Sequence, residues 1–333
     1  MRARYDQLIV TGLIARAPAK LNLQLSVGPL RRDGFHDLAT VFHAVSLFDE
    51  VTVRPAGRVT AGVEGEGAGR IPAGRGNLAV QAANELRKAT GIRDGAEILI
   101  RKLIPVAAGL AGGSADAAAT LVACNRLWRA GLGPAELSEL AAGIGSDVPF
   151  SLAGGTAVGL GRGERLTQAL VSGRYHWVLA VADAGLSTAT VYAECDRLRA
   201  LPASADRPAG CVDPGRSTRP GRRDVSRDLL AALRSGDAAA VGALLGNDLQ
   251  AAAVSLRPQL RRTLEAGREH GALGSIVSGS GPTCAFLARS EEHALELAAS
   301  LAGAGVCRHV ARVSGPAPGA IVTAQAAGRS GAP

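Results

Sequence analysis

The chain has 333 residues, enough for two domains, and 47% of them are hydrophobic, which is enough for a sizeable core. The formal net charge is +8, but only 3% of the residues are aromatic, so a surface that stacks single-stranded bases is disfavoured. No run of about 18 apolar residues occurs, so no membrane span is expected. Five widely spaced cysteines without a Cys-x-x-Cys motif indicate neither a disulfide framework nor a zinc site, and they favour the cytoplasm.

The basic residues are uneven in kind and in place. Only Lys20, Lys88 and Lys102 are lysines, so each is a candidate for a role that a guanidinium cannot fill. Much of the excess positive charge lies in residues 202–227, a segment rich in proline, glycine and arginine that we expect to be a mobile insertion. Because this charge is local, it weakens the case for a nucleic-acid-binding face.

Apolar periodicity predicts the elements of the first half of the chain. In order, we expect strands at 8–10, 21–27 and 41–53, a hairpin within 57–76, a helix over 77–90 and a strand over 96–104. Asn77 is well placed to cap the helix, because its side chain can accept a hydrogen bond from a free backbone N–H. The last strand leads into a loop of glycine and alanine.

The second half predicts more helix. We expect helices over 134–142, 228–245, 249–271 and 291–301, and a further helix that follows a loop at 184–192 and runs to about residue 201. Strands are expected at 153–161, 176–182 and 306–313, with a strand–turn–strand unit at 274–287. We place one domain in residues 1–163 and a second in 164–314. Residues 315–333 are expected to be a disordered tail.

Residues 105–121 combine a loop of small residues with the start of a helix. Gly109, Gly112 and Gly113 leave backbone N–H groups accessible, and the helix is expected to begin at Ser114 or Asp116. Unpaired N–H donors and partial positive charge at a helix N-terminus bind anions, most often phosphate. The alternative is a glycine-rich turn that merely precedes a core helix. No Gly-Lys-Ser/Thr sequence is present, so this loop is not a Walker A motif.

Three further positions carry side chains suited to chemistry, each with a plain structural alternative. Lys20 is either a solvated charge at a strand start or a functional ammonium. Phe35 and His36 lie in a turn that is either a surface loop or a platform for a flat ring. Asp147 follows a glycine turn and is either a helix cap or a proton acceptor. An anion-binding loop, a cation and a carboxylate together fit phosphoryl transfer to a hydroxyl group.

Five motifs in order resemble the GHMP kinases, and the match spans residues 15–313. The motifs are Pro18–Leu23, Asp33–His36, the signature loop Pro105–Ala118, Gly145–Pro149 and Ser278–Thr283. The resemblance implies an α+β fold with a ribosomal-S5-like N-terminal domain, an α/β-sandwich C-terminal domain and an active site in the cleft between them. It also implies ATP with Mg²⁺, an alcohol substrate that carries a cytidine diphosphate group, and a monomer or weak homodimer.

The same resemblance assigns roles to residues, but it assigns no metal ligand. Asp147 matches the catalytic base and Lys20 the lysine beside it. The matching ATP-binding residues are Asn77, Lys102, Pro105, Gly109, Leu110, Ala111, Gly112, Gly113 and Ser114. The matching substrate-binding residues are Asn22, Phe35, His36, Thr188, Tyr192, Gly279 and Gly281.

The loop departs from the family pattern in one respect. Ala107, Ala108, Ala111 and Ala115 stand at some places where the family is richer in glycine and serine. Alanine enters left-handed backbone less easily than glycine, so we expect the three glycines and Ser114 to do most of the phosphate binding. The alternatives are another GHMP small-molecule kinase, a catalytically inactive nucleotide-binding relative, or nucleic-acid binding through the arginine-rich segment.

Overall fold

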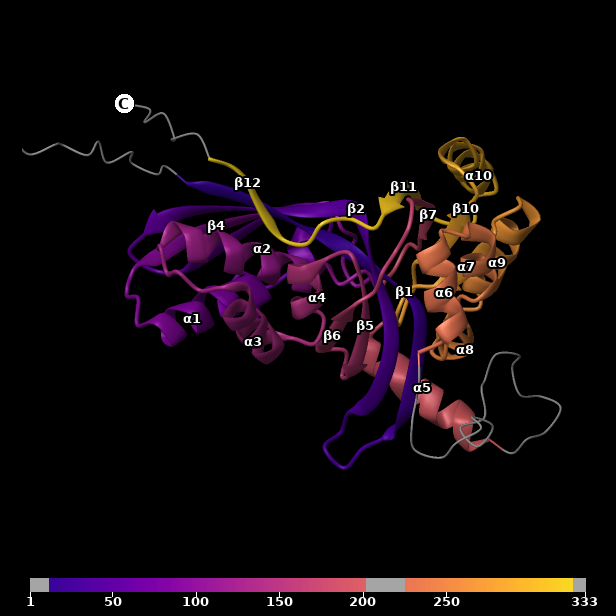
Figure 1. Ribbon diagram of the computed structural model, residues 1–333, viewed down its shortest axis with the longest axis horizontal. Coiled ribbons are helices and arrows are strands. Elements are labelled where there is room, and N and C mark those ends of the chain that lie inside the picture. The colour runs from indigo at the N-terminus through magenta and orange to yellow at the C-terminus, as the bar shows by residue number, and fades with distance from the viewer. Residues whose placement is uncertain (1–11, 202–224, 326–333) are drawn as a thin grey trace, which may run out of the picture.

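The computed structural model describes residues 12–201 and 225–325 (Figure 1). The strand expected at 8–10 and residues 202–224 of the expected insertion lie outside this part of the chain. The described residues form one eight-stranded and one four-stranded sheet with helices packed against both, as an α+β class requires.

The eight-stranded sheet is built on a long hairpin. Its central order is β12 (Ile321–Gln325), β1 (Leu13–Leu30), β2 (His36–Ala56), β4 (Gly95–Lys102) and β3 (Thr60–Gly65). In addition β5 (Thr156–Gly161) pairs with β2 and with β6 (Arg165–Gln168), and the short β8 (Gly246–Asn247) pairs with β1. The β1–β2 register shifts next to Ala19 and again after Asn22. Such bulges redirect the side chains beside them.

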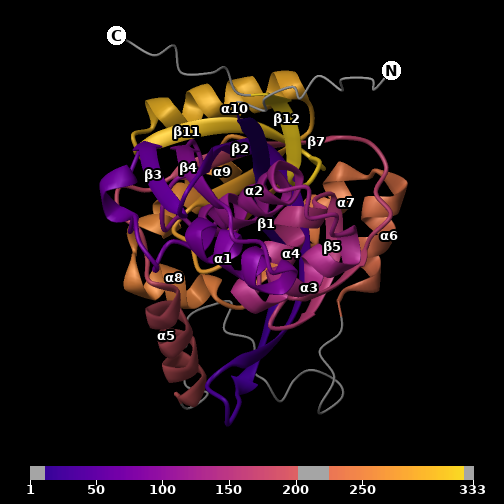
Figure 2. The same cartoon turned by 90° about the vertical axis from the view of Figure 1, so that its left-hand side faces the viewer.

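Helices cover one face of this sheet (Figures 1 and 2). They are α1 (Leu78–Thr90), α2 (Gly112–Leu127), α3 (Pro134–Ile144) and α4 (Val148–Ala153), with a 3₁₀ turn at Ala68–Arg70. The buried residues of α2 are mostly alanines, and α2 packs against β1 and β2. Small side chains let the helix approach the strands closely, so the loop before it is held firmly above the sheet.

The four-stranded sheet is antiparallel, in the order β11 (His309–Gly315), β7 (Tyr175–Val181), β10 (Cys284–Ala288) and β9 (Gly274–Val277). Its helices are α5 (Thr188–Ala200), α6 (Arg227–Ser235), α7 (Ala238–Ala243), α8 (Gln250–Leu256), α9 (Gln259–Glu269) and α10 (Glu291–Gly303). Val178, Phe286 and Leu264 belong to a buried cluster beneath these helices. In the part of the chain that the structure describes, no helix is long and apolar enough to cross a membrane.

Several expected elements differ in their bounds or pairing. The hairpin expected within residues 57–76 does not form, because this segment contains a single strand, β3, which pairs parallel with β4 after the chain crosses over through α1. The helix expected over 228–245 is interrupted at Gly236, which adopts a φ of 77°, and Asp237 caps α7. The helix expected over 249–271 divides into α8 and α9 at Arg257 and Pro258.

The expectation of a disordered tail from residue 315 is wrong for residues 315–325. Strand β11 extends through Gly315, and β12 pairs antiparallel with β1, from Leu13 with Gln325 to Arg16 with Ile321. The physical reason is that β1 would otherwise present an open edge of backbone donors and acceptors. Residues 326–333 lie outside the described part. The expected division at residue 163 falls within the β5–β6 hairpin, so the two sheets separate between Gln168 and Tyr175.

Candidate active site

A cavity of about 440 Å³ is lined by residues from both domains. Many of the residues assigned from the sequence lie around it, namely Lys20, Asn22, Asn77, Lys102, Pro105, Gly109, Ala111, Gly112, Gly113, Asp147, Thr188, Tyr192 and Gly279. They come from β1, α1, β4, the loop before α2, the turn before α4, α5 and the turn after β9. Side chains that are far apart in the chain therefore face one space.

Five assigned residues do not line this cavity. Leu110 is buried in the core, although its carbonyl oxygen accepts a hydrogen bond from the backbone N–H of Lys20 at 3.2 Å. Ser114 lies in the first turn of α2, and Gly281 lies within the Ser278–Thr283 turn, where it adopts a φ of 76°. Phe35 and His36 lie at the β1–β2 turn, outside the cavity wall.

The loop before α2 packs directly on the turn after β9. Gly109 adopts a φ of 77°, and a Cβ at this position would lie 2.2 Å from the carbonyl oxygen of Ser278. The Ser278 hydroxyl also donates to the carbonyl oxygen of Gly109 at 3.0 Å. Only glycine satisfies both the backbone conformation and the close approach, so Gly109 couples the two domains at the cavity.

Helix α2 begins at Gly112, two residues before the earlier of the two predicted starts. Ala111 precedes the helix with a φ of 59° and provides no side-chain cap, and Ala107 also adopts a φ of 56°. The first N–H groups of α2 therefore have neither an intrahelical acceptor nor a capping side chain. This arrangement leaves donors and partial positive charge directed toward the cavity, as an anion site requires.

Lys20 lies buried on β1, where its ammonium donates to Asn22 Oδ1 at 2.6 Å. Burial lowers the pKa of Lys20, and the negative charge of Asp147 raises it in part. Asp147 precedes α4 but makes no side-chain capping bond, so its carboxylate is not used to satisfy the helix. The Asp147 side chain therefore does not act as a helix cap. Lys20 and Asp147 interact electrostatically without a direct ion pair.

Gly279 closes the cavity above Lys20. It adopts a φ of 55°, and a Cβ there would lie 3.1 Å from Lys20 Nζ and 3.3 Å from Asn22 Oδ1. A side chain at this position would crowd the buried ammonium. Ser280 follows, and its hydroxyl lies 3.1 Å from that of Thr188 on α5. The glycine turn thus completes the wall opposite β1.

Lys102 lies at the base of the loop, paired with two buried carboxyl groups that we did not assign from the sequence. Its ammonium contacts Asp49, and it donates to Asp116 Oδ2 at 2.7 Å. Asp49 Oδ1 accepts from the backbone N–H groups of Leu103 at 2.7 Å and Ile104 at 2.8 Å. An aspartate inside the apolar run of β2 was the available signal for Asp49, since a buried charge needs a partner. Asp116 had been considered only as a helix start.

Two of the three residues assigned to a flat ring, His36 and Tyr192, meet between the β1–β2 turn and α5. The His36 and Tyr192 rings lie 5.0 Å apart between centroids, tilted by 36°. His36 Nδ1 lies 2.7 Å from the carbonyl oxygen of Gly28, and Nε2 lies 3.3 Å from Asp196 Oδ2. Phe35 is 48% exposed, and the Arg162 guanidinium lies 5.0 Å from its ring centroid. Burial, with a smaller effect of Asp147, raises the pKa of Tyr192.

Among residues 12–201 and 225–325, no group of three or more histidine, cysteine, aspartate or glutamate side chains is placed to hold a metal ion. Magnesium commonly keeps several waters and binds through one or two carboxylates together with substrate phosphates, and that mode of binding needs no such group.

Comparison with known proteins identifies related sequences and structures. The GHMP kinases N terminal domain matches residues 77–155, and the GHMP kinases C terminal domain matches residues 229–307. A protein of Nocardia farcinica, "4-diphosphocytidyl-2-C-methyl-D-erythritol kinase", is 55% identical over 95% of this chain and 97% of its own length. A protein of the same name from Mycobacterium tuberculosis is 52% identical over 94% of each chain.

Solved structures show the same relationship. A crystal structure of 4-(cytidine 5'-diphospho)-2C-methyl-D-erythritol kinase is 32% identical, with a TM-score of 0.70 over 91% of this chain and 98% of its own. A homoserine kinase from Cytophaga hutchinsonii is 20% identical, with a TM-score of 0.71 over 96% of this chain and 100% of its own. At that identity the second match demonstrates a shared fold alone.

Proposed function

The chain belongs to the GHMP kinase family, and from this membership we propose that it phosphorylates the 2-hydroxyl of 4-diphosphocytidyl-2-C-methyl-D-erythritol. It is an ATP-dependent kinase that acts on a small molecule. The substrate is the one in the names of relatives that match nearly the whole chain, and the reaction belongs to non-mevalonate isoprenoid precursor synthesis. The observation that carries the proposal is that Lys20, Asp147 and the uncapped N-terminus of α2 line one cavity.

The triphosphate of ATP would lie on the loop before α2. The uncapped N–H groups at Gly112 and Gly113 and the partial charge of α2 supply hydrogen bonds to phosphate oxygens. Asn77 lines the part of the cavity that we assign to the adenosine end, whereas Lys102, which we also expected there, lies beneath the start of α2. Magnesium bound to the triphosphate would neutralise part of its negative charge.

Asp147 is the proposed general base. It accepts the proton of the 2-hydroxyl as that oxygen forms its bond to the γ-phosphorus, while the bond from the γ-phosphorus to the bridging oxygen breaks and ADP leaves. The Lys20 ammonium favours the ionised carboxylate and attracts the developing negative charge of the nucleophile. Asn22 orients that ammonium through its hydrogen bond.

The cytidine end would lie between the β1–β2 turn and α5. Phe35, His36 and Tyr192 offer aromatic surfaces there, and Thr188 lies beside the Gly279–Gly281 turn. His36 already covers part of the Tyr192 ring, so a base that stacks on Tyr192 must share or replace that contact. We place the reaction in the cytoplasm, with a monomer or weak homodimer and with neither nucleic acid nor membrane as a partner.

A panel of substrates tests the proposal. ADP release is measured with ATP, Mg²⁺ and either the cytidyl substrate, homoserine or mevalonate. We expect turnover with the cytidyl compound at a kcat/KM at least about a hundredfold above the others, because a site that hydrogen-bonds its substrate rejects compounds that lack the partner group. Turnover with homoserine or mevalonate alone would assign the chain to another activity of the family. No turnover with any of them would favour the inactive nucleotide-binding alternative.

A further inference from the structure

Three buried ionisable groups form a cluster beneath the phosphate loop. We call Asp49 of β2, Lys102 of β4 and Asp116 of α2 the acid–lysine cluster, and their side chains are 0%, 2% and 4% exposed. The cluster lies directly under the start of α2, because Lys102 Nζ is 3.1 Å from the place that a Cβ on Gly112 would occupy. Any net charge on it therefore acts on whatever binds at that helix N-terminus.

The two carboxyl groups are not equivalent. Asp49 Oδ1 accepts from two backbone N–H groups, and Asp49 Oδ2 contacts Lys102, so a full negative charge on Asp49 is well satisfied. Asp116 Oδ2 accepts from Lys102, but among the described residues its buried Oδ1 has no hydrogen-bond partner. A negative charge on Asp116 would leave a carboxylate oxygen unsatisfied in the interior, at substantial cost.

Burial and the neighbouring carboxylate favour the protonated form of Asp116, as the unpartnered Oδ1 does. Burial and the adjacent Asp49 carboxylate raise its pKa well above the usual range, and Lys102 only partly opposes them. Among the described residues, Asp49 from β2 and Lys102 from β4 are the charged groups identified as acting on Asp116. With one ammonium, the cluster carries a net negative charge if both acids are ionised, and it is neutral if one is protonated.

We propose that Asp116 is a positioning residue that keeps its proton when ATP binds, so that the cluster anchors Lys102 and α2 without placing negative charge under the phosphates. A net negative charge here would oppose the partial positive charge, equivalent to roughly half an elementary charge, at the start of α2. The side chain of a protonated Asp116 can donate a hydrogen bond to Asp49 and still accept one from Lys102. The inference rests on the proposed binding of the ATP phosphates at this loop.

Infrared spectroscopy tests the protonation directly. At pH 7.5 we expect the wild type to show the carbonyl band of a buried, protonated carboxylic acid, and Asp116→Asn to lack it. This measurement needs neither substrate, so it remains decisive if the proposed kinase reaction fails. Absence of the band from the wild type, or its survival in Asp116→Asn, would overturn the proposal.

Two variants test the positioning role by the affinity for MgATP, measured calorimetrically. Asparagine is uncharged and has nearly the size and shape of a protonated aspartic acid. The Asp116→Asn variant should therefore bind MgATP with a Kd within about threefold of that of the wild type. Asp116→Ala releases Lys102 and should weaken binding by more than about tenfold, as expected for loss of a hydrogen bond to a charged group. Weak binding by both variants, with melting temperatures unchanged, would mean that an ionised Asp116 is required.

Asp49→Asn is the matched control, because it makes the same change at the carboxyl group whose two oxygens both have hydrogen-bond partners. The proposal predicts that it lowers the melting temperature more than Asp116→Asn does, since an amide would turn N–H groups toward Lys102. Equal decreases in melting temperature for the two variants would contradict the proposed difference between the Asp49 and Asp116 carboxyl groups. If Asp49→Asn fails to fold, that outcome agrees with the prediction, and the infrared comparison still decides the location of the proton.

Discussion

Lys20 combines a buried position with a charge that the proposed reaction requires. Burial lowers its pKa below the ordinary lysine value of 10.5, and Asp147 offsets part of that decrease. As pH rises through this lowered pKa, the ammonium loses its proton and its attraction for the nucleophile. We therefore expect kcat/KM for the alcohol substrate to fall on the alkaline side before an ordinary lysine would titrate. A flat profile up to the usual lysine range would contradict a charged Lys20 in catalysis.

Substitution separates Lys20 and Asp147 from other charges. Lys20→Met and Asp147→Asn should each lower kcat by about 10²–10⁴, the range typical of acid–base groups, with little change in the circular dichroism spectrum. Lys88→Met is the matched control, because the Lys88 side chain is 79% exposed and, among the residues that the structure describes, pairs only with Glu85 on its own helix. Its kcat should equal that of the wild type. A loss of similar size in the control would implicate stability rather than chemistry.

At the scale of residues, the sequence drew attention to two side chains that the structure brings to the cavity. Lys20 was notable as one of three lysines, and Asp147 as a carboxylate after a glycine turn. Asp49 was not assigned, because no local pattern shows that a strand aspartate is buried against a lysine 53 residues away. Such pairings depend on which strands become neighbours, and periodicity along one strand does not contain that information.

At the scale of elements, the loop before α2 shows that alanine adds backbone strain when it replaces glycine in a glycine-rich motif. Ala107 and Ala111 both adopt left-handed backbone, with φ values of 56° and 59°. Each such residue costs roughly 1–2 kcal/mol relative to right-handed backbone. The expectation that the loop would depart from its relatives was based on composition, and the structure locates the strain at these two residues.

Ala111 provides the test. Ala111→Gly should change the free energy of unfolding by less than about 1 kcal/mol, because relief of strain offsets the extra entropy of unfolded glycine. Ala89, exposed within α1, is the control, and Ala89→Gly should cost about 0.5–1 kcal/mol. Urea denaturation measures both changes. If Ala111→Gly destabilises more than Ala89→Gly, the left-handed backbone at Ala111 is wrong.

Element types were predicted better than element partners. The glycine after α6 and the proline before α9 ended helices that apolar periodicity alone had joined. Residues 60–65 do form a strand, but their partner is β4 rather than a second strand within residues 57–76. Periodicity reports which face is buried, whereas pairing depends on the path of the whole chain. This is why β12 was also missed as a strand.

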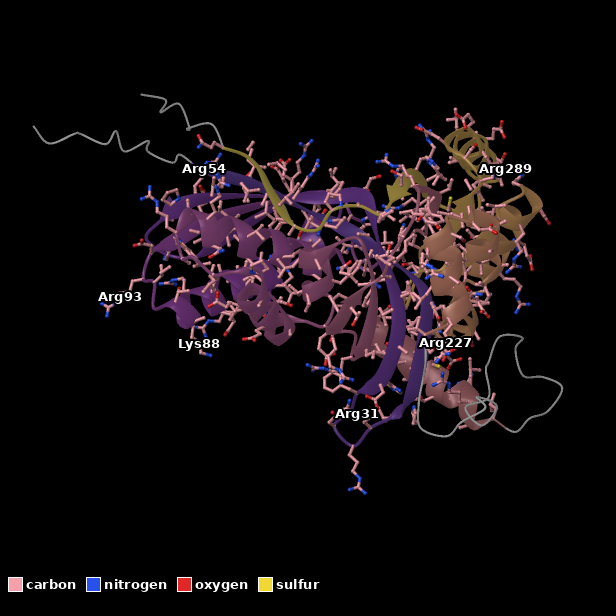
Figure 3. The ribbon with its side chains drawn as sticks, viewed as in Figure 1. Arg31, Arg54, Lys88, Arg93, Arg227 and Arg289 are labelled. Carbon is pink, nitrogen blue, oxygen red and sulfur yellow. The ribbon has the colours of Figure 1, made fainter. Side chains whose placement is uncertain are left out.

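At the scale of the molecule, the chain ends by returning to its first strand. Strand β12 covers the edge of β1, so the C-terminal region stabilises the N-terminal sheet (Figure 1). The basic residues labelled in Figure 3, among them Arg31, Lys88 and Arg289, lie at separate places around the molecule rather than on one face. These labelled residues therefore form no single basic face.

Truncation tests the role of β12. Removal of residues 321–333 should lower the melting temperature by at least about 2–4 °C, equivalent to roughly 1 kcal/mol in a chain of this size, because the β1 edge loses its partner. Removal of residues 326–333 alone, which takes away no described contact, is the control. An unchanged melting temperature after the longer truncation would show that β12 adds no stability.

The central claim is that this cavity transfers a phosphoryl group from ATP to one hydroxyl of a cytidyl-linked alcohol. The most direct measurement is ³¹P and ¹³C nuclear magnetic resonance of the product formed from 4-diphosphocytidyl-2-C-methyl-D-erythritol, ATP and Mg²⁺. We predict one new phosphomonoester signal, with phosphorus–carbon coupling at the carbon that bears the 2-hydroxyl, and none with Asp147→Asn. Inorganic phosphate as the only new signal, or phosphorylation at another hydroxyl, would contradict the account.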